Sequence, residues 1–160
     1  MDKSVRLRVH HFYDVIRDFG VGKKIEPHPD GHSFHRIAQL IRSNPKLKIK
    51  IVVDYDSICD GCSHLKGGHC DDVVNHRKDF KLKEEFNNYV DRRIMDRCQI
   101  KEGEILTPFQ LCQKAKCYLD NIGLVYLGND EWHTKGRKKN VNKGLKYYSQ
   151  LHGFSFDPGK

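Results

Sequence analysis

The chain has 160 residues, of which 38% are hydrophobic and 31% charged, and its formal net charge is +8. This length corresponds to one ordinary domain that can bury a core without covalent cross-links, and eight Phe and seven Tyr argue against disorder. No apolar run approaches the length of a membrane span. The positive charge favours polyanions such as nucleic acid, anionic cofactors or anionic lipid surfaces, but on charge alone a soluble protein with a basic surface is the favoured explanation.

The N-terminal sequence MDKSVRLRVHHFYDV lacks the apolar segment of a secretory signal. The default expectation is therefore a cytoplasmic protein, in which thiols stay reduced. Under reducing conditions, six cysteines are more typical of metal binding or reactive thiols than of three disulfides.

The first half of the chain alternates predicted strands and helices. Apolar residues alternate with basic ones over residues 5–9, which predicts a short half-buried strand. Helical spacing then predicts helices over residues 10–20 and 33–43, the second closed by Asn-Pro. Residues 46–55 alternate lysine with Leu and Ile, which predicts a second strand.

The second half is predicted to be mostly helical. Residues 82–98 are amphipathic, EGEIL is a predicted turn, and residues 107–119 begin with Thr107 as a helix N-cap. We therefore expect an α+β fold: a small, mostly helical domain with a short sheet and a cysteine-rich metal loop. The predicted division places this domain at residues 1–128 and a basic, Lys/Tyr-rich C-terminal extension at 129–160.

The cysteine-rich loop contains Cys59, Cys62 and Cys70, spaced C-x2-C-x7-C among glycines that allow tight turns. Three converging thiolates bind zinc with a fourth ligand, or hold three irons of a [4Fe–4S] cluster. The cluster is slightly favoured, because zinc ribbons usually present a second C-x2-C pair and none occurs here. The structural alternative is packing of free thiols, but so polar a loop offers little core to bury them.

The other three cysteines are Cys98, Cys112 and Cys117. Taken singly, each is better explained by helix packing than by ligation. Cys112 and Cys117 are five residues apart, which places them somewhat off a common helical face, although both can reach a site near the end of that helix.

Three segments together resemble an uncharacterised family of short bacterial and archaeal proteins that are expected to bind iron–sulfur clusters. The segments are RLRVHHFYDVI, IVVDYDSICDGCSHLKGGHCDD and DRRIMDRCQIKEGEILTPFQL, and the resemblance covers roughly residues 5–117. It implies that the end of the N-terminal strand lies beside the cysteine loop. It also implies one shared site made of His10, His11, Cys59, Cys62 and Cys70.

The chain departs from this family pattern in two places. Asp14 stands where the family has a helical cysteine after the His-His pair, and the C-terminal Cys-x-x-Cys-x-Trp type motif is absent. The resemblance therefore implies a cluster without its fourth thiolate, or one in which an oxygen or nitrogen ligand replaces it.

The histidine pair and Asp14 are candidates for that fourth position. His11 and Asp14 share a helical face, so they can ligate metal together, or Asp14 can orient a histidine. Without the resemblance, His11 would be interpreted as a core histidine and His10 as a surface one. His64 and His69 flank the cysteine loop and are expected to be exposed.

The C-terminal segment interleaves six basic residues with Trp132, Tyr147 and Tyr148. This pattern suits nucleic-acid binding, but a solvated helix face or a flexible tail gives the same pattern. No dinucleotide fingerprint or P-loop is present.

The leading functional hypothesis is an iron–sulfur protein of anaerobic character that transfers electrons to a redox partner protein or binds a small anionic substrate. The alternative is a zinc-stabilised module whose basic tail contacts nucleic acid. A third is a metal-dependent enzyme with His10 or His11 as general acid/base. The sequence leaves open whether any reaction is catalysed.

Overall fold

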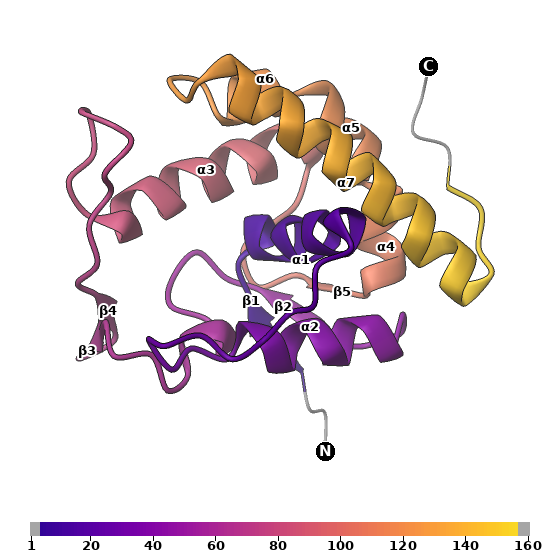
Figure 1. The fold of residues 1–160 in the computed structure, drawn as a ribbon, viewed down its shortest axis with the longest axis horizontal. Coiled ribbons are helices and arrows are strands. Elements are labelled where there is room, and N and C mark those ends of the chain that lie inside the picture. Colours follow the sequence, from indigo (N-terminus) through magenta and orange to yellow (C-terminus); the bar gives the residue numbers. More distant parts are fainter. Residues whose placement is uncertain (1–3, 157–160) are drawn as a thin grey trace.

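The computed structural model describes residues 4–156, and these form a mostly helical α+β fold with a small sheet, as predicted (Figure 1). The helices are α1 (Val9–Val21), α2 (Phe34–Ser43), α3 (Lys83–Cys98), α4 (Pro108–Gln113), α5 (Ala115–Asp120), α6 (Ile122–Val125) and α7 (Glu131–His152), with the 3-10 helix η1 at Ser57–Cys59. The strands are β1 (Val5–Leu7), β2 (Ile49–Ile51), β3 (Leu65–Lys66), β4 (His69–Cys70) and β5 (Ile105–Leu106).

The main sheet has the order β1-β2-β5 and fixes the start of α1. β1 pairs with β2 in parallel, and β2 pairs with β5 antiparallel. The predicted strand over residues 46–55 is shorter in the structure, because its neighbours offer only two or three residues for pairing. A single residue, Arg8, separates β1 from α1. The His10–His11 pair therefore lies at the strand–helix junction, where sequence analysis placed it.

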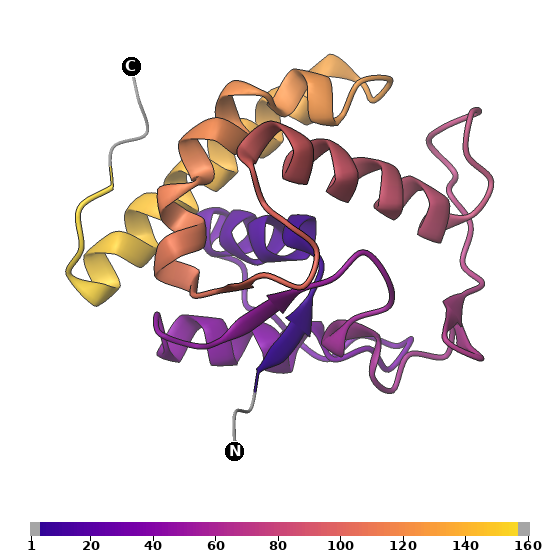
Figure 2. The same cartoon turned by 180° about the vertical axis from the view of Figure 1, so that it is seen from behind.

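Helix α1 lies in the middle of the molecule. Both Figure 1 and Figure 2 show α2 on one side of it and α3 and α7 on the other. α1 buries Phe12, Tyr13 and Ile16 completely, and the Tyr13 ring stacks on Tyr118 with ring centroids 4.1 Å apart. These contacts form the centre of the hydrophobic core.

The contact between α1 and α7 is unusually close because each helix contributes a glycine. A methyl group at Gly20 would overlap the carbonyl oxygen of Asn140, and one at Gly144 would overlap the carbonyl oxygen of Ile16. The two backbones can approach this far only without side chains at these positions. α7 is thereby fixed along α1.

The segment expected to be a basic C-terminal extension is therefore largely a packed helix. α7 buries Val141, Leu145 and Tyr148 completely, and its lysines lie on the opposite, solvent-facing side. Of the two structural alternatives for this charge run, the solvated helix face describes residues 131–152. Residues 157–160 of the predicted extension lie outside the described residues.

Two other elements differ from the sequence-based expectation. The helix predicted over residues 107–119 is divided at Lys114 into α4 and α5, so Cys112 and Cys117 lie on different helices. The EGEIL segment contains the predicted turn, but its last two residues continue as β5 because they pair with β2. None of the described helices combines the length and apolar character needed to cross a membrane.

The cysteine loop protrudes from this packed body between β2 and α3 (Figure 1). No residue from 59 to 82 is fully buried. The regular structure within it is the two-stranded hairpin β3–β4, in which Leu65 pairs with Cys70. Polar contacts, more than apolar packing, hold this segment on the molecule.

Candidate metal centre at the start of α1

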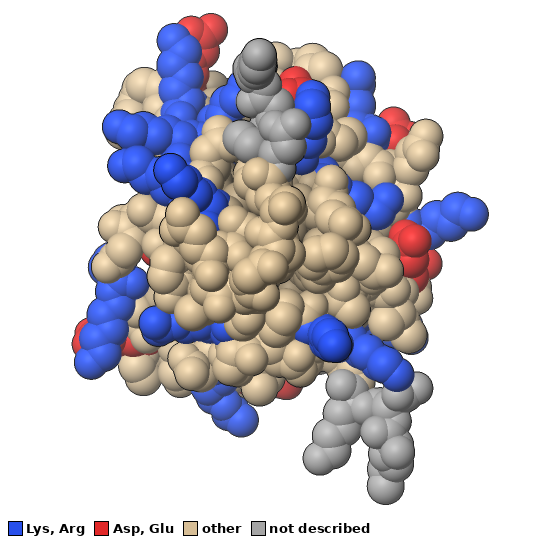
Figure 3. Space-filling model, turned by 90° about the vertical axis from the view of Figure 1, so that its right-hand side faces the viewer, with Lys and Arg blue, Asp and Glu red and all other residues tan. Residues whose placement is uncertain are grey.

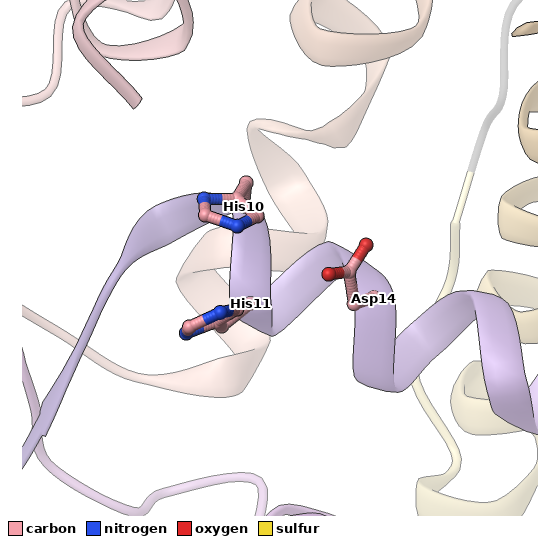
Figure 4. Close-up of side chains that lie close together, drawn as sticks. All are labelled: His10, His11 and Asp14. Atoms are coloured by element: carbon pink, nitrogen blue, oxygen red, sulfur yellow. The ribbon is translucent and has the colours of Figure 1, made fainter. Parts of the chain in front are cut away.

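Two histidines, His10 and His11, begin α1, and Figure 4 shows their rings beside one another with Asp14 one turn further along. The ring centroids are 4.3 Å apart. His10 is the more buried of the two, at 7% relative exposure, whereas the sequence alone had favoured a surface position for it. The difference arises because α3 covers the start of α1 on the His10 side.

The buried Asp91 of α3 forms hydrogen bonds with both the backbone and the ring of His10. Its Oδ1 accepts hydrogen bonds from the His10 backbone N–H at 3.0 Å and lies 2.7 Å from His10 Nδ1. Its Oδ2 accepts from Arg8 Nη1 at 2.8 Å. Burial raises the pKa of Asp91, but the charges and hydrogen bonds of His10 and Arg8 lower it by more. The pKa of this fully buried carboxyl therefore lies below its ordinary value.

Asp56 holds the His11 ring by a hydrogen bond, as Asp91 holds His10, and it also connects His11 to the cysteine loop. Its Oδ2 lies 2.7 Å from His11 Nδ1 and accepts from the Arg8 backbone N–H at 2.8 Å. Its Oδ1 accepts from the Ile58 backbone N–H at 3.1 Å and from Cys59 Sγ at 3.6 Å. One buried carboxylate thus joins the end of β1, the start of α1 and the first loop cysteine.

These carboxylates determine which ring nitrogen of each histidine is available. Because an ionised carboxylate only accepts hydrogen bonds, Nδ1 donates in both rings and Nε2 is left free. Burial lowers the pKa of His11, but Asp56 raises it more, so the net pKa lies above the ordinary value. A histidine held by a carboxylate at one nitrogen and free at the other is typical of metal ligands and of proton donors.

Both histidines and all three loop cysteines line one cavity of about 930 Å³. The five residues that the family resemblance assigned to a shared site therefore line one cavity, but among the described residues the group whose ligand atoms lie within 4.8 Å of one another is His10, His11 and Asp14, without a cysteine. Further cavity residues come from the loop before α2, from the start of α2, from α3 and from α7: His28, His32, Phe34, Asn87 and Arg137. The volume is within the range of small-molecule and cofactor sites.

The local backbone explains how the three cysteines reach this cavity. The Cys62 N–H bonds to the Cys59 carbonyl at 3.0 Å, which closes the C-x2-C turn. The β3–β4 hairpin then returns Cys70 to the cavity through Gly67 and Gly68, both at positive φ. Glycine adopts this conformation without strain.

Two of the loop thiols, Cys59 and Cys70, have raised pKa values in the ligand-free chain. Burial, together with the neighbouring Asp56 carboxylate, raises the pKa of Cys59 to about 12, and burial raises the pKa of Cys70. A metal ion or cluster lowers thiol pKa values by binding the thiolate, so loading of this site would release protons.

Asp14 has its own partners. It is a potential metal ligand by position, since ligand atoms of His10, His11 and Asp14 all lie within 4.8 Å of one another. Its carboxylate, however, forms ion pairs with Arg137 of α7 and with Arg17, the latter at 3.3 Å. Burial raises the pKa of Asp14, but these two guanidinium groups lower it to well below its usual range. A cation at Asp14 would have to compete with both arginines.

The remaining cysteines do not line the cavity. Cys98 and Cys112 are buried in the core, and burial raises the pKa of Cys112 to about 12. The Cys117 thiol donates to the Arg97 carbonyl at 3.2 Å. These contacts agree with the packing role that was favoured for each of them.

The loop histidines also have defined positions. His64 lines the cavity and is held 2.8 Å from Asp71, whereas His69 is exposed and bonds to Glu84 at 3.2 Å. The stacked rings of His28 and His32, 4.4 Å apart, also line the cavity, and sequence analysis did not select them.

The two aspartates that hold the histidine pair were also missed. Asp91 occupies the buried stripe of α3 between Val90 and Ile94, where a carboxylate needs a specific partner, and this position was the available signal. Asp56 precedes the first cysteine by three residues in DYDSIC, but Asp54 stands in the same segment, and the sequence does not tell which of the two is buried.

Fold and site together define a class: a small α+β protein with a histidine pair held by carboxylates above a protruding three-cysteine loop. The family model "Protein of unknown function (DUF1284)" matches residues 32–125, and the chain belongs to this family. The match contains the cysteine loop, Asp56 and Asp91, while the histidine pair precedes it. No curated protein and no solved structure matches the chain.

Proposed function

We propose that the cavity is a metal centre that holds a [4Fe–4S] cluster through Cys59, Cys62 and Cys70, with the histidine pair facing the position that has no thiolate. The observation that carries the proposal is that these three thiols and two carboxylate-held imidazoles line the same cavity. When bound, such a cluster supplies either an electron or a Lewis-acidic iron.

The chain's donor set fits this group. Three thiols arranged by a C-x2-C turn and a hairpin leave one coordination position for a non-thiol ligand. His11 is the best-placed residue for it, because Asp56 fixes its ring and also contacts Cys59. Asp14 fits less well, since its carboxylate is already neutralised by Arg137 and Arg17.

The histidines would also handle protons in the cavity. With Nδ1 held by a carboxylate, each Nε2 can bind iron or exchange a proton with a molecule in the cavity. Roughly 930 Å³ is more volume than a cluster alone requires, which leaves room for a small anionic substrate beside it. Electron transfer to a redox partner protein is the use that needs no such substrate.

A single zinc ion is the second candidate, and one observation favours it. The ligand atoms of His10, His11 and Asp14 lie within 4.8 Å of each other, which is close enough for one ion. Zinc takes nitrogen, sulfur and oxygen ligands in a tetrahedral arrangement, so it would need the arginine pairs of Asp14 to break or Cys59 to join.

Anaerobic purification followed by iron, sulfide and zinc analysis tests the proposal. We expect about four irons and four sulfides per chain and broad visible absorption. Serine at Cys59, Cys62 or Cys70 should remove most of this iron. Cys117→Ser is the matched control and should retain it, because Cys117 lies outside the cavity.

Two results would reject the cluster. Colourless protein with one zinc per chain, lost in His10→Ala and His11→Ala variants, would establish the second candidate instead. Full iron content in all three loop cysteine variants would show that these thiols are not ligands.

A further inference from the structure

The solvent-facing side of α7 carries a line of lysines that the metal centre does not use. Lys135, Lys139, Lys143 and Lys146 follow one another at intervals of three or four residues, and all are exposed. At this spacing side chains share one helical face, and it is the face opposite Val141 and Leu145. We call these four residues the lysine row.

The lysine row has no charge compensation within the protein. None of its four ammonium groups forms an ion pair with a carboxylate of residues 4–156. Lysines elsewhere do find such partners: Lys83 pairs with Asp72 at 3.3 Å. α7 lies at the front of the molecule in Figure 1. In Figure 3, where the molecule is turned by 90°, that side is on the left, and Lys and Arg side chains gather at its upper end.

The chain's only tryptophan extends this row. Trp132 lies one turn before Lys135 on the same face, and its side chain is 71% exposed. With a rise of 1.5 Å per residue, the row from position 132 to 146 is about 21 Å long. The exposed indole of Trp132 lies at one end of the lysine row and does not pack into the hydrophobic core.

We propose that Trp132 and the lysine row bind single-stranded nucleic acid, with the lysines along the phosphates and the indole stacked on a base. Evenly spaced cations beside an aromatic platform are how sequence-tolerant single-strand binders work. The net charge of +8 would add long-range attraction. This surface is separate from the metal cavity and requires no bound metal.

The structure favours nucleic acid over a lipid surface. Interfacial helices insert an apolar face between lipid headgroups. The apolar face of α7 is unavailable for this, because Val141, Leu145 and Tyr148 are buried and Gly144 lies against the α1 backbone. Only the charged side of α7 can meet a partner.

Fluorescence anisotropy with labelled oligouridylate and oligothymidylate of about 12 nucleotides tests the proposal on the purified protein. We expect binding whose logarithmic salt slope is about −3, since four contacts to a single strand each contribute about −0.7. The double variant Lys139→Gln/Lys143→Gln should bind about tenfold more weakly and reduce the slope by about half.

A charge-matched control separates this row from general attraction to a basic protein. Lys50→Gln/Lys101→Gln also removes two exposed lysines, but from β2 and the turn before β5. It should change affinity less than twofold. Equal losses in both double variants would overturn the proposal, as would no binding at 50 mM salt.

Trp132 gives a second, independent test. Stacking on a base should quench the emission of this single tryptophan, and Trp132→Leu should weaken binding about fivefold or more. Unchanged emission at saturation would contradict the stacking. Tighter binding to vesicles containing anionic lipid than to oligonucleotides, lost in the Lys139/Lys143 variant, would assign the row to membranes and refute the proposal.

Discussion

The α1–α7 interface and the cysteine loop are stabilised in opposite ways. The interface is mostly apolar, with two helices in backbone contact at Gly20 and Gly144 and one ion pair, between Asp14 and Arg137, at the end near the cavity. The loop, residues 59–82, contains no fully buried residue and is held by polar contacts such as Cys59 to Asp56. Apolar packing holds the interface together, whereas the loop depends on polar contacts and, under the proposed function, on a bound metal.

This difference assigns separate roles to the two regions. The packed region positions α1 and thereby the first turn with its histidines. The loop supplies the thiols, and Asp56 and Asp91 join the two regions through Arg8, His10 and His11. Metal binding would thus stabilise the loop while changing the interface little.

Asp91→Asn should have the largest effect, because it disturbs the junction of the two regions. The change removes the ion-pair partner of the Arg8 guanidinium, and Arg8 as a whole is only 2% exposed. Breaking a buried ion pair from one side costs about 3–5 kcal/mol. Urea unfolding measures the loss, and Asp96→Asn on the exposed side of the same helix should change stability by less than about 0.5 kcal/mol.

Gly144→Ala tests the packed region alone. The added methyl would force α7 away from the Ile16 carbonyl, at a cost of about 2–3 kcal/mol. Gly136→Ala, in the same helix but with open space around it, should gain up to about 1 kcal/mol because alanine is the better helix former. Similar effects from the two alanines would refute the close helix contact.

Arg137→Met tests the ion pair that joins α7 to Asp14 beside the cavity. It removes one of two partners of Asp14, and we expect a loss of about 2 kcal/mol at pH 7, less than for a fully buried pair. The pKa of Asp14 is lowered in the folded chain, so this stabilisation exists above its ordinary value of 3.8 and is lost as pH falls through the folded value. The difference in thermal midpoint between variant and wild type should therefore shrink below pH 3.8.

Removal of metal should have the smallest effect on global stability and act mainly on the loop. We expect trypsin to cut residues 59–82 about tenfold faster after anaerobic chelation, because local opening becomes easier. α7, although rich in lysine, should resist cleavage in both forms, since its backbone is fixed on α1. Peptide mapping by mass spectrometry distinguishes the sites, and equal loop cleavage with and without metal would contradict a ligand-held loop.

The sequence predicted the fold wherever a periodic pattern coincides with packing. The stripes of α2 and α3 and the alternation in β1 gave those elements nearly to their ends. It could not predict the break of the helix at Lys114 or the pairing of β5, because both depend on contacts with distant segments. The Gly20–Gly144 approach is equally invisible to local patterns.

The residues of the candidate site follow the same rule, because some of them carry local sequence signals and others do not. Cysteine spacing and the His-His pair are local signals, and the structure brings them to one cavity. The partners of the histidines, Asp56 and Asp91, come from other elements, and only the folded chain shows which aspartates are buried. Asp14 was selected as a ligand from helical spacing, which cannot reveal its arginine partners on α1 and α7.

X-ray absorption at the metal edge of anaerobically purified protein tests the central claim most directly, since it reports the atoms around the metal. The account predicts iron with sulfur and iron neighbours, and a light-atom contribution that decreases in His11→Ala. A shell of nitrogen and oxygen alone, with no sulfur, would contradict it.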